Sequence, residues 1–341
     1  MPASTSPAPA VANQGGAEAL IATRPSGAAM MVSGPFSSTT ALVRAAAARA
    51  AAMRSGPGGP NTLPEGTIVE RDLVYGRTER RDLKLDLYLP PGDAPKPLLI
   101  WIHGGAWSMG SKDGPSPAQQ FVASGYAVAH VGYRFSQEAR WPAQMHDCKA
   151  AVRWLRANAA KYHYDPQRFA VWGSSAGGHL VAVLGTSGGV PELEGTGNDL
   201  KESSSVQAVV DWFGPTDFLQ MDKAGSDMNH DAARSPESHL IGGPIQENKE
   251  AAAKANPITY ISKGALPPFL IMHGERDRTV PFNQSELLRD ALQAAHADVT
   301  FRPVPGAGHG FGGENNIAPV REFLARVFAA KPAPASSKSK P

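Results

Sequence analysis

Six short, continuous apolar runs divide the middle of the sequence, and segments with helical periodicity lie between several of them. The runs are residues 98–102, 126–131, 169–172, 206–212, 269–272 and 299–304. Runs of this kind are typical of strands buried on both faces. Between two of them, Met145, Cys148, Val152 and Leu155 recur at spacings of 3, 4 and 3, which places them on one helix face. The alternation predicts an α/β fold with a mostly parallel central sheet and helices on both faces.

The ordered pattern begins near Thr67. Leucines at 83, 85, 87 and 89 alternate with Lys84, Asp86 and Tyr88, which predicts a half-buried strand in an antiparallel start to the sheet. Residues 187–204 and 218–256 are richer in Gly, Ser, Asn and charged residues. We interpret them as cap or lid loops above the carboxyl-terminal ends of the strands, where binding residues concentrate.

The ends of the chain differ in composition from the rest. Residues 1–60 are rich in Ala, Pro, Ser and Gly, with Glu18 as the one acidic residue. We interpret them as a low-complexity, disordered extension, with an overcalled start codon or a transit peptide as alternatives. Residues 61–330 are then the folded domain and residues 331–341 a disordered tail. No convincing signal peptide is present, so a cytoplasmic location is favoured over secretion.

Charge and composition exclude several classes of function. The net charge is +2, from 33 basic and 31 acidic residues, which argues against general electrostatic binding of nucleic acid. No segment approaches the ~20 consecutive apolar residues of a membrane span. The single cysteine, Cys148, excludes an internal disulfide framework and falls on the predicted apolar helix face, so we expect a core residue.

The strongest motif is Gly173-Ser174-Ser175-Ala176-Gly177, which fits Gly-x-Ser-x-Gly. It follows the apolar run 169–172 and precedes a helical apolar run at 179–184, which is the strand–turn–helix context that the motif requires. The register of the motif selects Ser175 over Ser174. The motif therefore predicts that Ser175 is a nucleophile presented on a strained turn.

A second glycine-rich turn, with the sequence His-Gly-Gly-Ala-Trp, follows the run 98–102. Acyl transfer places negative charge on one oxygen, so the site needs preformed N–H donors. We expect Gly105, Ala106 and Ala176 to supply them. The His103 side chain is expected to brace the turn. Trp107 either lines the acyl or alcohol pocket or packs against the sheet.

A serine hydroxyl needs a base to accept its proton, and the base needs a carboxylate to fix its tautomer. Asp277 and His309 each come just after a predicted strand, in the order serine, aspartate, histidine. We therefore predict His309 as the general base and Asp277 as its partner. Glu275, Asp211 and Asp217 are the competing carboxylates.

No cluster of His, Asp or Glu shows the spacing of metal ligands, so neither a metal nor a cofactor is predicted. His230 and Asp231 lie in a polar loop and are expected to be surface residues rather than ligands.

Together these motifs resemble bacterial α/β-hydrolase esterases, in the feruloyl and acetyl-xylan esterase-like branch near the hormone-sensitive-lipase-like esterases. The resemblance spans roughly residues 67–330 and is carried by residues 103–107, residues 172–180, His273-Gly274 with Asp277, Val280-Pro281, and residues 308–310. It implies the α/β-hydrolase fold, and it implies the roles already given for Ser175, Asp277 and His309.

The resemblance also implies an acyl-enzyme mechanism on small-molecule or polymer-attached esters, with an acetyl or an aromatic, feruloyl-type acyl group. An aromatic acid would pack against Trp107, Trp212 or Phe213, although core packing explains these rings equally well. One departure is visible, because many hormone-sensitive-lipase-like members have a third glycine where this chain has Ala106. The added Cβ disfavours esters of bulky tertiary alcohols.

Two other classes of function remain as alternatives. A serine peptidase of the oligopeptidase-related type would typically carry a large gating domain, which the 60 or so residues before the sheet cannot build. A non-catalytic binding protein on a hydrolase fold usually loses a triad residue, whereas all three are present here. The sequence does not determine the natural substrate or the oligomeric state.

Overall fold

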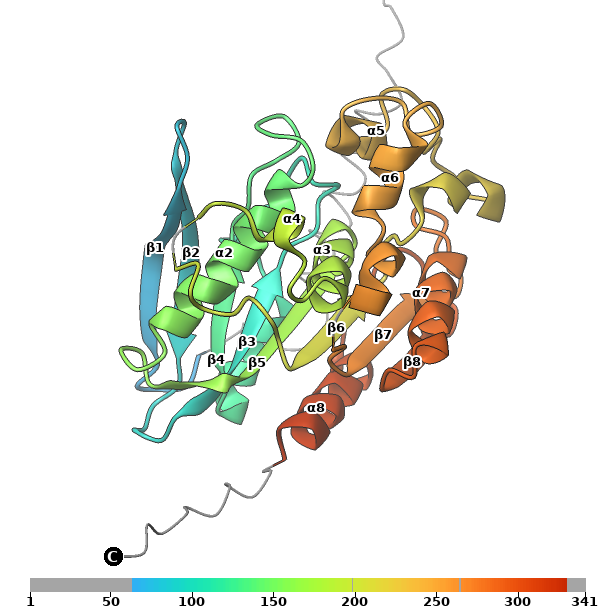
Figure 1. The fold of residues 1–341 in the computed structure, drawn as a ribbon. Coiled ribbons are helices and arrows are strands. Elements are labelled where there is room, and N and C mark those ends of the chain that lie inside the picture. The colour runs from blue at the N-terminus through green and yellow to red at the C-terminus, as the bar shows by residue number, and fades with distance from the viewer. Residues whose placement is uncertain (1–62, 198, 264, 330–341) are drawn as a thin grey trace, which may run out of the picture. The chain divides into compact units, whose positions relative to one another are not determined.

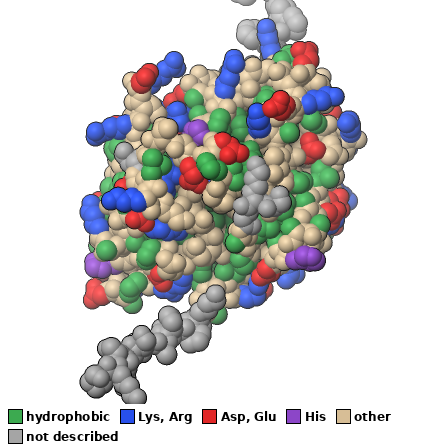
Figure 2. Space-filling view, in the orientation of Figure 1, with side chains coloured by type: hydrophobic (Ala, Val, Ile, Leu, Met, Phe, Trp, Pro, Cys, Tyr) green, Lys and Arg blue, Asp and Glu red, His purple; other side chains and the backbone are tan. Residues whose placement is uncertain are grey.

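The computed structural model describes residues 63–197, 199–263 and 265–329 (Figure 1). The predicted extension over residues 1–60 and the predicted tail over residues 331–341 lie outside the described residues. Within the described part of the chain, no helix is long and apolar enough to cross a membrane. Basic and acidic side chains are interspersed on the face drawn in Figure 2.

One eight-stranded sheet organises the described residues, in the order β1-β2-β4-β3-β5-β6-β7-β8. Its strands are β1 (Ile68–Arg77), β2 (Asp82–Leu89), β3 (Lys96–Ile102), β4 (Ala127–Val131), β5 (Tyr164–Ser174), β6 (Ala208–Trp212), β7 (Phe269–Gly274) and β8 (Val299–Val304). β2 pairs antiparallel with β1 and β4, and all other pairs are parallel. The predicted parallel sheet with an antiparallel start is therefore confirmed.

Helices and 3₁₀ turns connect the strands (Figure 1). They are η2 (Pro117–Ser124), α2 (Ala143–Ala157), α3 (Ala176–Thr186), α4 (Pro191–Glu194), η3 (Phe218–Gln220), η4 (Asp222–Ala224), α5 (Pro236–Ile241), α6 (Lys249–Ala255), η5 (Pro257–Lys263), α7 (Asn283–Ala294) and α8 (Glu314–Phe328).

Side chains alternate between the two faces of the sheet, so each strand contributes to two separate hydrophobic cores. In β3, Leu98, Ile100 and Ile102 join the core that contains α2, α3 and α7. Leu99 and Trp101 join the core that contains η2 and α8. The alternation follows from the two-residue period of a strand. It explains why the runs are apolar throughout, since helices cover both faces.

The predicted helix face of α2 is confirmed, because Met145, Cys148, Val152 and Leu155 are completely buried. Burial raises the pKa of the Cys148 thiol well above its ordinary value. The thiol therefore stays protonated and behaves as a small apolar residue.

The prediction of a half-buried β2 is only partly right, because the face assigned to solvent is covered at Asp86 and Tyr88 but stays partly exposed at Asp82 and Lys84. Asp86 is completely buried and accepts hydrogen bonds from Arg71 Nη1 at 2.7 Å, Asp72 N at 2.9 Å and Lys112 Nζ at 2.8 Å. Burial acts to raise the pKa of Asp86, but these donors outweigh it and hold the pKa below its ordinary value. Lys112 thus covers the Asp86 part of the face that the alternation assigned to solvent.

The two predicted cap segments differ in position. Figure 1 shows α5 and α6, from the 218–256 segment, beyond the carboxyl ends of the parallel strands. Of the 187–204 segment, residues 192–197 run along α2, and Glu192 and Leu193 also line a cavity together with residues of α5 and α6. Glu194 is held there by Lys149 Nζ at 2.8 Å and Arg153 Nη1 at 2.7 Å, and both cations are buried. The glycine-rich composition correctly indicated a connecting segment, but it could not show which part of the fold the segment covers.

We predict that Asp86→Ala lowers the free energy of unfolding by about 3 kcal/mol, because it leaves part of a buried ionic network uncompensated. Asp82→Ala is the matched control on the same strand. Asp82 pairs with Arg77 at 3.3 Å, and its side chain is 42% exposed, so its loss should cost under about 1 kcal/mol. Urea unfolding of both variants measures the difference, and equal losses would contradict a special role for the Asp86 network.

Candidate active site

Ser175 occupies a tight turn between β5 and α3. Its φ of 55° lies in the left-handed region, which is costly for a residue with a side chain. The Ser175 amide donates to Trp212 O at 2.9 Å, which ties the turn to β6. A Cβ on Gly173 would collide with the Gly177 carbonyl, and a Cβ on Gly177 would collide with the Ile102 carbonyl. Both glycines are therefore required by close packing of backbone segments.

The structure brings the three residues of the predicted triad together. His309 Nε2 lies 2.9 Å from Ser175 Oγ, and His309 Nδ1 lies 2.7 Å from Asp277 Oδ2. Asp277 follows β7 and His309 follows β8. Because parallel strands end at the same edge of a sheet, residues more than 100 positions apart converge there.

Asp277 is held by several donors. Its Oδ1 accepts from Thr279 N at 2.8 Å and Val280 N at 3.0 Å, and its Oδ2 lies 3.2 Å from His273 Nε2. Burial acts to raise the pKa of Asp277, but interactions with His273 and His309 outweigh it, so the pKa lies well below its ordinary range. The carboxylate is therefore ionised and oriented towards His309.

Aromatic rings surround the histidine. The Phe213 ring lies 4.9 Å from the His309 ring in an edge-on arrangement, and 5.1 Å from the Phe311 ring. Phe213 and Phe311 are almost completely buried. These rings limit the positions that the imidazole can adopt.

The loop after β3 packs directly against the serine turn. A Cβ on Gly104 would lie 2.7 Å from Ser174 O and 3.3 Å from Ser175 Cβ. Gly105 and Ala106 have φ values of 115° and 52°. Within residues 63–329, apart from 198 and 264, neither of their amides donates to another backbone group. Ala176 begins α3, so its amide has no partner inside that helix.

The three predicted substrate-binding rings are placed mainly by packing. Trp107, Trp212 and Phe213 are 2%, 3% and 4% exposed. Trp107 Nε1 donates to His179 Nδ1 at 3.2 Å, and its ring packs on Phe218. The packing alternative named the sheet, whereas Trp107 packs on His179 of α3 and Phe218 of η3, and its contact with a substrate stays a prediction. His103 is buried and stacks on Tyr133 with the ring centres 4.5 Å apart, as a bracing residue would.

The competing carboxylates lie in other surroundings. Glu275 is exposed, and Asp217 caps η3 by accepting from Leu219 N at 3.1 Å. Asp211 is completely buried and accepts from Gly214 N at 2.9 Å. Among the described residues, His309 pairs with Asp277 and makes no hydrogen bond or ion pair with any of these three carboxylates.

The expectation that His230 is a surface residue is wrong, because His230 is 2% exposed. It lies 3.0 Å from Glu237 Oε1 and 2.9 Å from Thr279 O, two residues after Asp277. Burial opposes protonation, but Glu237 outweighs it and raises the pKa of His230. Composition indicated a polar loop and could not show that the loop folds over the turn after β7.

Two supporting histidines were not predicted as functional residues. His273 contacts Asp277, and the sequence signal was its position four residues earlier, at the end of the apolar run. His179 joins the loop after β3 to the cap, since it lies 2.7 Å from Ala255 O as well as contacting Trp107. No sequence pattern marked this link, because its three segments are far apart in the chain.

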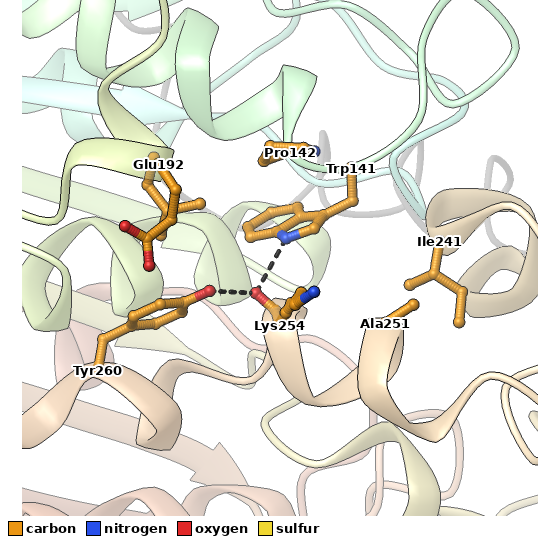
Figure 3. A pocket seen from close by; sticks show the side chains of 8 residues that line it. Trp141, Pro142, Glu192, Ile241, Ala251, Lys254 and Tyr260 are labelled. Atoms are coloured by element: carbon orange, nitrogen blue, oxygen red, sulfur yellow. Dashed lines mark hydrogen bonds between the residues drawn. The ribbon is translucent and has the colours of Figure 1, made fainter.

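Two cavities lie near these elements. The larger, of about 440 Å³, is lined by Trp141, Glu192, Lys254, Tyr260 and neighbours (Figure 3). The smaller, of about 270 Å³, lies between the segment after β4 and α5. Among the described residues, no group of three or more His, Cys, Asp or Glu side chains could hold a metal ion.

The mostly parallel sheet, the serine on a strained strand–helix turn, and the aspartate and histidine after β7 and β8 define a protein of the α/β-hydrolase fold. The family model BD-FAE matches residues 85–292, more than half of the chain. The chain therefore belongs to the BD-FAE family.

Individual relatives agree with this assignment. Esterase LipC of Mycobacterium tuberculosis (strain ATCC 25618 / H37Rv) is 35% identical over 249 residues, which cover 72% of this chain and 60% of that protein. A truncated form of carbohydrate esterase from gut microbiota has 34% identity and a TM-score of 0.71, covering 81% of this chain and 100% of that chain. The thermophilic esterase Est2 of Thermogutta terrifontis has 28% identity and a TM-score of 0.59, covering 80% and 96%.

The chain spans about three fifths of the length of the curated relatives that it matches, with 60%, 61% and 56% of three Mycobacterium tuberculosis proteins covered.

We predict that Asp211→Asn becomes progressively stabilising, relative to the parent protein, as pH rises from 4 to 7. Burial raises the pKa of Asp211 from 3.8 to about 6. Between these values the unfolded chain releases a proton that the folded protein retains, so rising pH favours unfolding of the parent. The difference should grow by up to about 3 kcal/mol. Urea unfolding at several pH values measures the difference in unfolding free energy between the variant and the parent. A difference that does not change with pH would contradict the raised pKa of Asp211.

Proposed function

We propose that this protein is a serine carboxylic-ester hydrolase that acts through an acyl-enzyme. The observation that carries the proposal is the single imidazole that lies within hydrogen-bond distance of both Ser175 Oγ and Asp277 Oδ2. A serine, a base and an orienting carboxylate in this geometry are the components of nucleophilic acyl transfer.

In the first step, Ser175 Oγ attacks the ester carbonyl carbon while its proton passes to His309 Nε2. The Nδ1–H of His309 donates to Asp277 Oδ2, which orients the ring and stabilises the imidazolium that forms. The tetrahedral intermediate then collapses, the bond to the alcohol oxygen breaks, and His309 returns the proton to the departing alcohol. The acyl group remains on Ser175.

In the second step, water attacks the acyl carbon and gives a proton to His309 Nε2. The bond to Ser175 Oγ then breaks, the carboxylic acid leaves, and the serine regains its proton. In both steps the developing oxyanion would lie against the amides of Gly105, Ala106 and Ala176. The positive φ values of Gly105 and Ala106, and the start of α3 at Ala176, favour this role.

For the substrate we propose small acyl or aromatic, feruloyl-type esters, free or attached to a polymer. The names of the relatives support ester substrates, and one similar structure is a carbohydrate esterase. The buried position of Trp107, Trp212 and Phe213 favours a small acyl group over direct stacking on these rings.

We predict that Ser175→Ala lowers kcat for 4-nitrophenyl acetate by at least about 10³-fold, because the acyl-enzyme can no longer form. Ser174→Ala is the matched control, since it removes the adjacent hydroxyl from the same turn and should keep most of the activity. Circular dichroism checks that both variants fold. Retained activity in folded Ser175→Ala, or its loss only in Ser174→Ala, would show that the nucleophile is misassigned.

We predict that Asp277→Asn lowers kcat by about 10³- to 10⁴-fold while KM changes little, because the amide cannot hold the required His309 tautomer. Glu275→Gln makes the same chemical change two residues away at an exposed position and should have little effect. Steady-state kinetics on 4-nitrophenyl acetate separates the two parameters. Similar effects from both variants would point to a general disturbance of the loop instead.

A further inference from the structure

The backbone of the loop after β3 adopts a costly conformation at three consecutive residues. Gly105, Ala106 and Trp107 have positive φ values of 115°, 52° and 52°. Two of these residues carry side chains, and such residues adopt the left-handed region only where their surroundings impose it. Contacts from other parts of the fold must therefore hold the loop in this shape.

The loop is attached to the nucleophile segment at two points. The first is Gly104, which packs on the serine turn, since an added Cβ would lie 2.7 Å from Ser174 O. The second is the Trp107 side chain, whose Nε1 donates to His179 Nδ1 at 3.2 Å. His179 lies in the first turn of α3, where its amide donates to Ser175 O at 3.0 Å. The second attachment therefore leads back to the nucleophile through one helical turn.

The His179 ring is neutral, and its tautomer is fixed by its two partners. The ring is completely buried, and burial lowers the pKa of His179 from 6.5 to about 4. Trp107 Nε1 can only donate, so His179 Nδ1 is the unprotonated nitrogen. Nε2 therefore carries the proton, and it lies 2.7 Å from Ala255 O, which can only accept. Each ring nitrogen thus has a partner that matches it, and rotation of the ring would break both bonds.

The carbonyl that orients His179 belongs to the end of α6, and this end is itself held in place. The preceding carbonyl, Lys254 O, accepts from Trp141 Nε1 at 2.9 Å and from Tyr260 Oη at 2.6 Å (Figure 3). Carbonyls of the last helical turn have no amide partner inside the helix, so they are available for such contacts. The rings of Trp141 and Phe218 also pack on His179, with the ring centres 5.5 and 5.3 Å away. The cap therefore fixes the position of the His179 ring.

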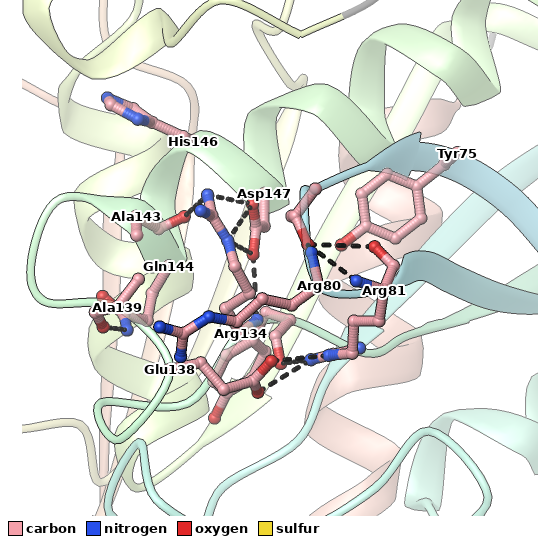
Figure 4. Close-up of polar contacts among 12 residues, drawn as sticks. Tyr75, Arg80, Arg81, Arg134, Glu138, Ala139, Ala143, Gln144, His146 and Asp147 are labelled. Atoms are coloured by element: carbon pink, nitrogen blue, oxygen red, sulfur yellow. Dashed lines mark hydrogen bonds and ion pairs between the residues drawn. The ribbon is translucent and has the colours of Figure 1, made fainter.

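The main chain of Trp107 has a separate support in the segment after β4. Trp107 O accepts from Ser136 N at 2.8 Å. Two residues before Ser136, Arg134 makes paired hydrogen bonds to Asp147 on α2, with Nη2 2.7 Å from Oδ1 and Nε 2.9 Å from Oδ2 (Figure 4). This support does not involve His179, so a change at His179 can release the indole while the Trp107 main chain keeps its contact.

We propose that His179 is a positioning residue for the candidate oxyanion hole. The candidate donors come from two separate pieces of backbone, with Gly105 and Ala106 on the loop and Ala176 at the start of α3. Stabilisation of the tetrahedral intermediate requires donors held at hydrogen-bond distance from one oxygen. The Trp107–His179 bond links the two pieces and fixes their separation. The inference rests on the proposed function, and it adds a residue that acts through Trp107 without touching the substrate.

The test uses 4-nitrophenyl acetate as substrate and butylboronic acid as inhibitor. A boronic acid adds to the serine hydroxyl as a tetrahedral anion, so its inhibition constant measures binding in the oxyanion hole. His179→Leu removes the acceptor, Trp107→Phe removes the donor, and His179→Asn places an amide oxygen near the Nδ1 position. Val181→Ala is the matched control, because Val181 is completely buried on the same helix, about 200° around it from His179. It shows what general destabilisation of α3 does to the kinetics.

His179→Leu and Trp107→Phe should each lower kcat about tenfold or more and change KM less than about twofold, because the oxyanion donors act mainly in the transition state. Both variants should raise the inhibition constant of butylboronic acid by a factor similar to the loss in kcat. The double variant should lose little more than either single variant, since each removes the same bond. His179→Asn should recover part of the loss, and Val181→Ala should keep the parent's values.

Circular dichroism checks that each variant folds. A folded His179→Leu that keeps the parent's kcat, or that loses no more of it than Val181→Ala, would overturn this inference and leave the proposed esterase function in place. Fully additive losses in the double variant would do the same. If His179→Leu does not fold, Trp107→Phe decides on the same criteria, because it keeps an aromatic ring and the Ser136 contact. A parent without esterase activity, or activity that survives Ser175→Ala, would instead overturn the proposed function.

Discussion

The close approach of three backbone segments at Ser175 is the constraint on which the rest of the site depends. The serine has a φ of 55°, a conformation that costs of the order of 1–3 kcal/mol and persists only where the surroundings impose it. Here β5 and α3 approach each other at Gly173 and Gly177, and the end of β3 passes close to Gly177. The same packing places the loop with Gly105 and Ala106 against the nucleophile turn. One steric arrangement therefore positions both the hydroxyl and the candidate oxyanion donors.

Two buried carboxylates, Asp277 and Asp86, are each stabilised by donors that come from different segments. Asp277 is ionised because a turn of its own chain and two histidines donate to it, although burial opposes ionisation. Asp86 is stabilised in the same way by Arg71 and Lys112. Among the described residues only the Gly214 amide donates to Asp211, and burial raises the pKa of this carboxyl to about 6. Asp277 is the carboxylate that contacts His309, with Oδ2 2.7 Å from Nδ1, and its lowered pKa keeps it ionised.

The cap and the segment after β4 give the site its surroundings. His230, from the cap, contacts the Thr279 carbonyl in the turn that follows Asp277. His179 connects the loop after β3 with the end of α6. The segment after β4 is held by the Arg134–Asp147 and Arg81–Glu138 pairs, and its Arg140 lies against Gly242 at the end of α5. The cap is thus linked by hydrogen bonds both to the turn that follows Asp277 and to the loop after β3.

The sequence by itself determined the parallel sheet, the serine turn and the identity of the three residues that meet there. Apolar runs, the Gly-x-Ser-x-Gly register and residues that directly follow strands are local patterns, and parallel strands bring their carboxyl ends to one edge. Only the tertiary structure decided that Asp86 and His230 are buried, that Trp107 packs on His179, and that residues 192–197 run along α2. These features depend on which distant segment covers a given side chain. The sequence around a polar residue looks the same whether its hydrogen bonds are made to water or to another part of the protein.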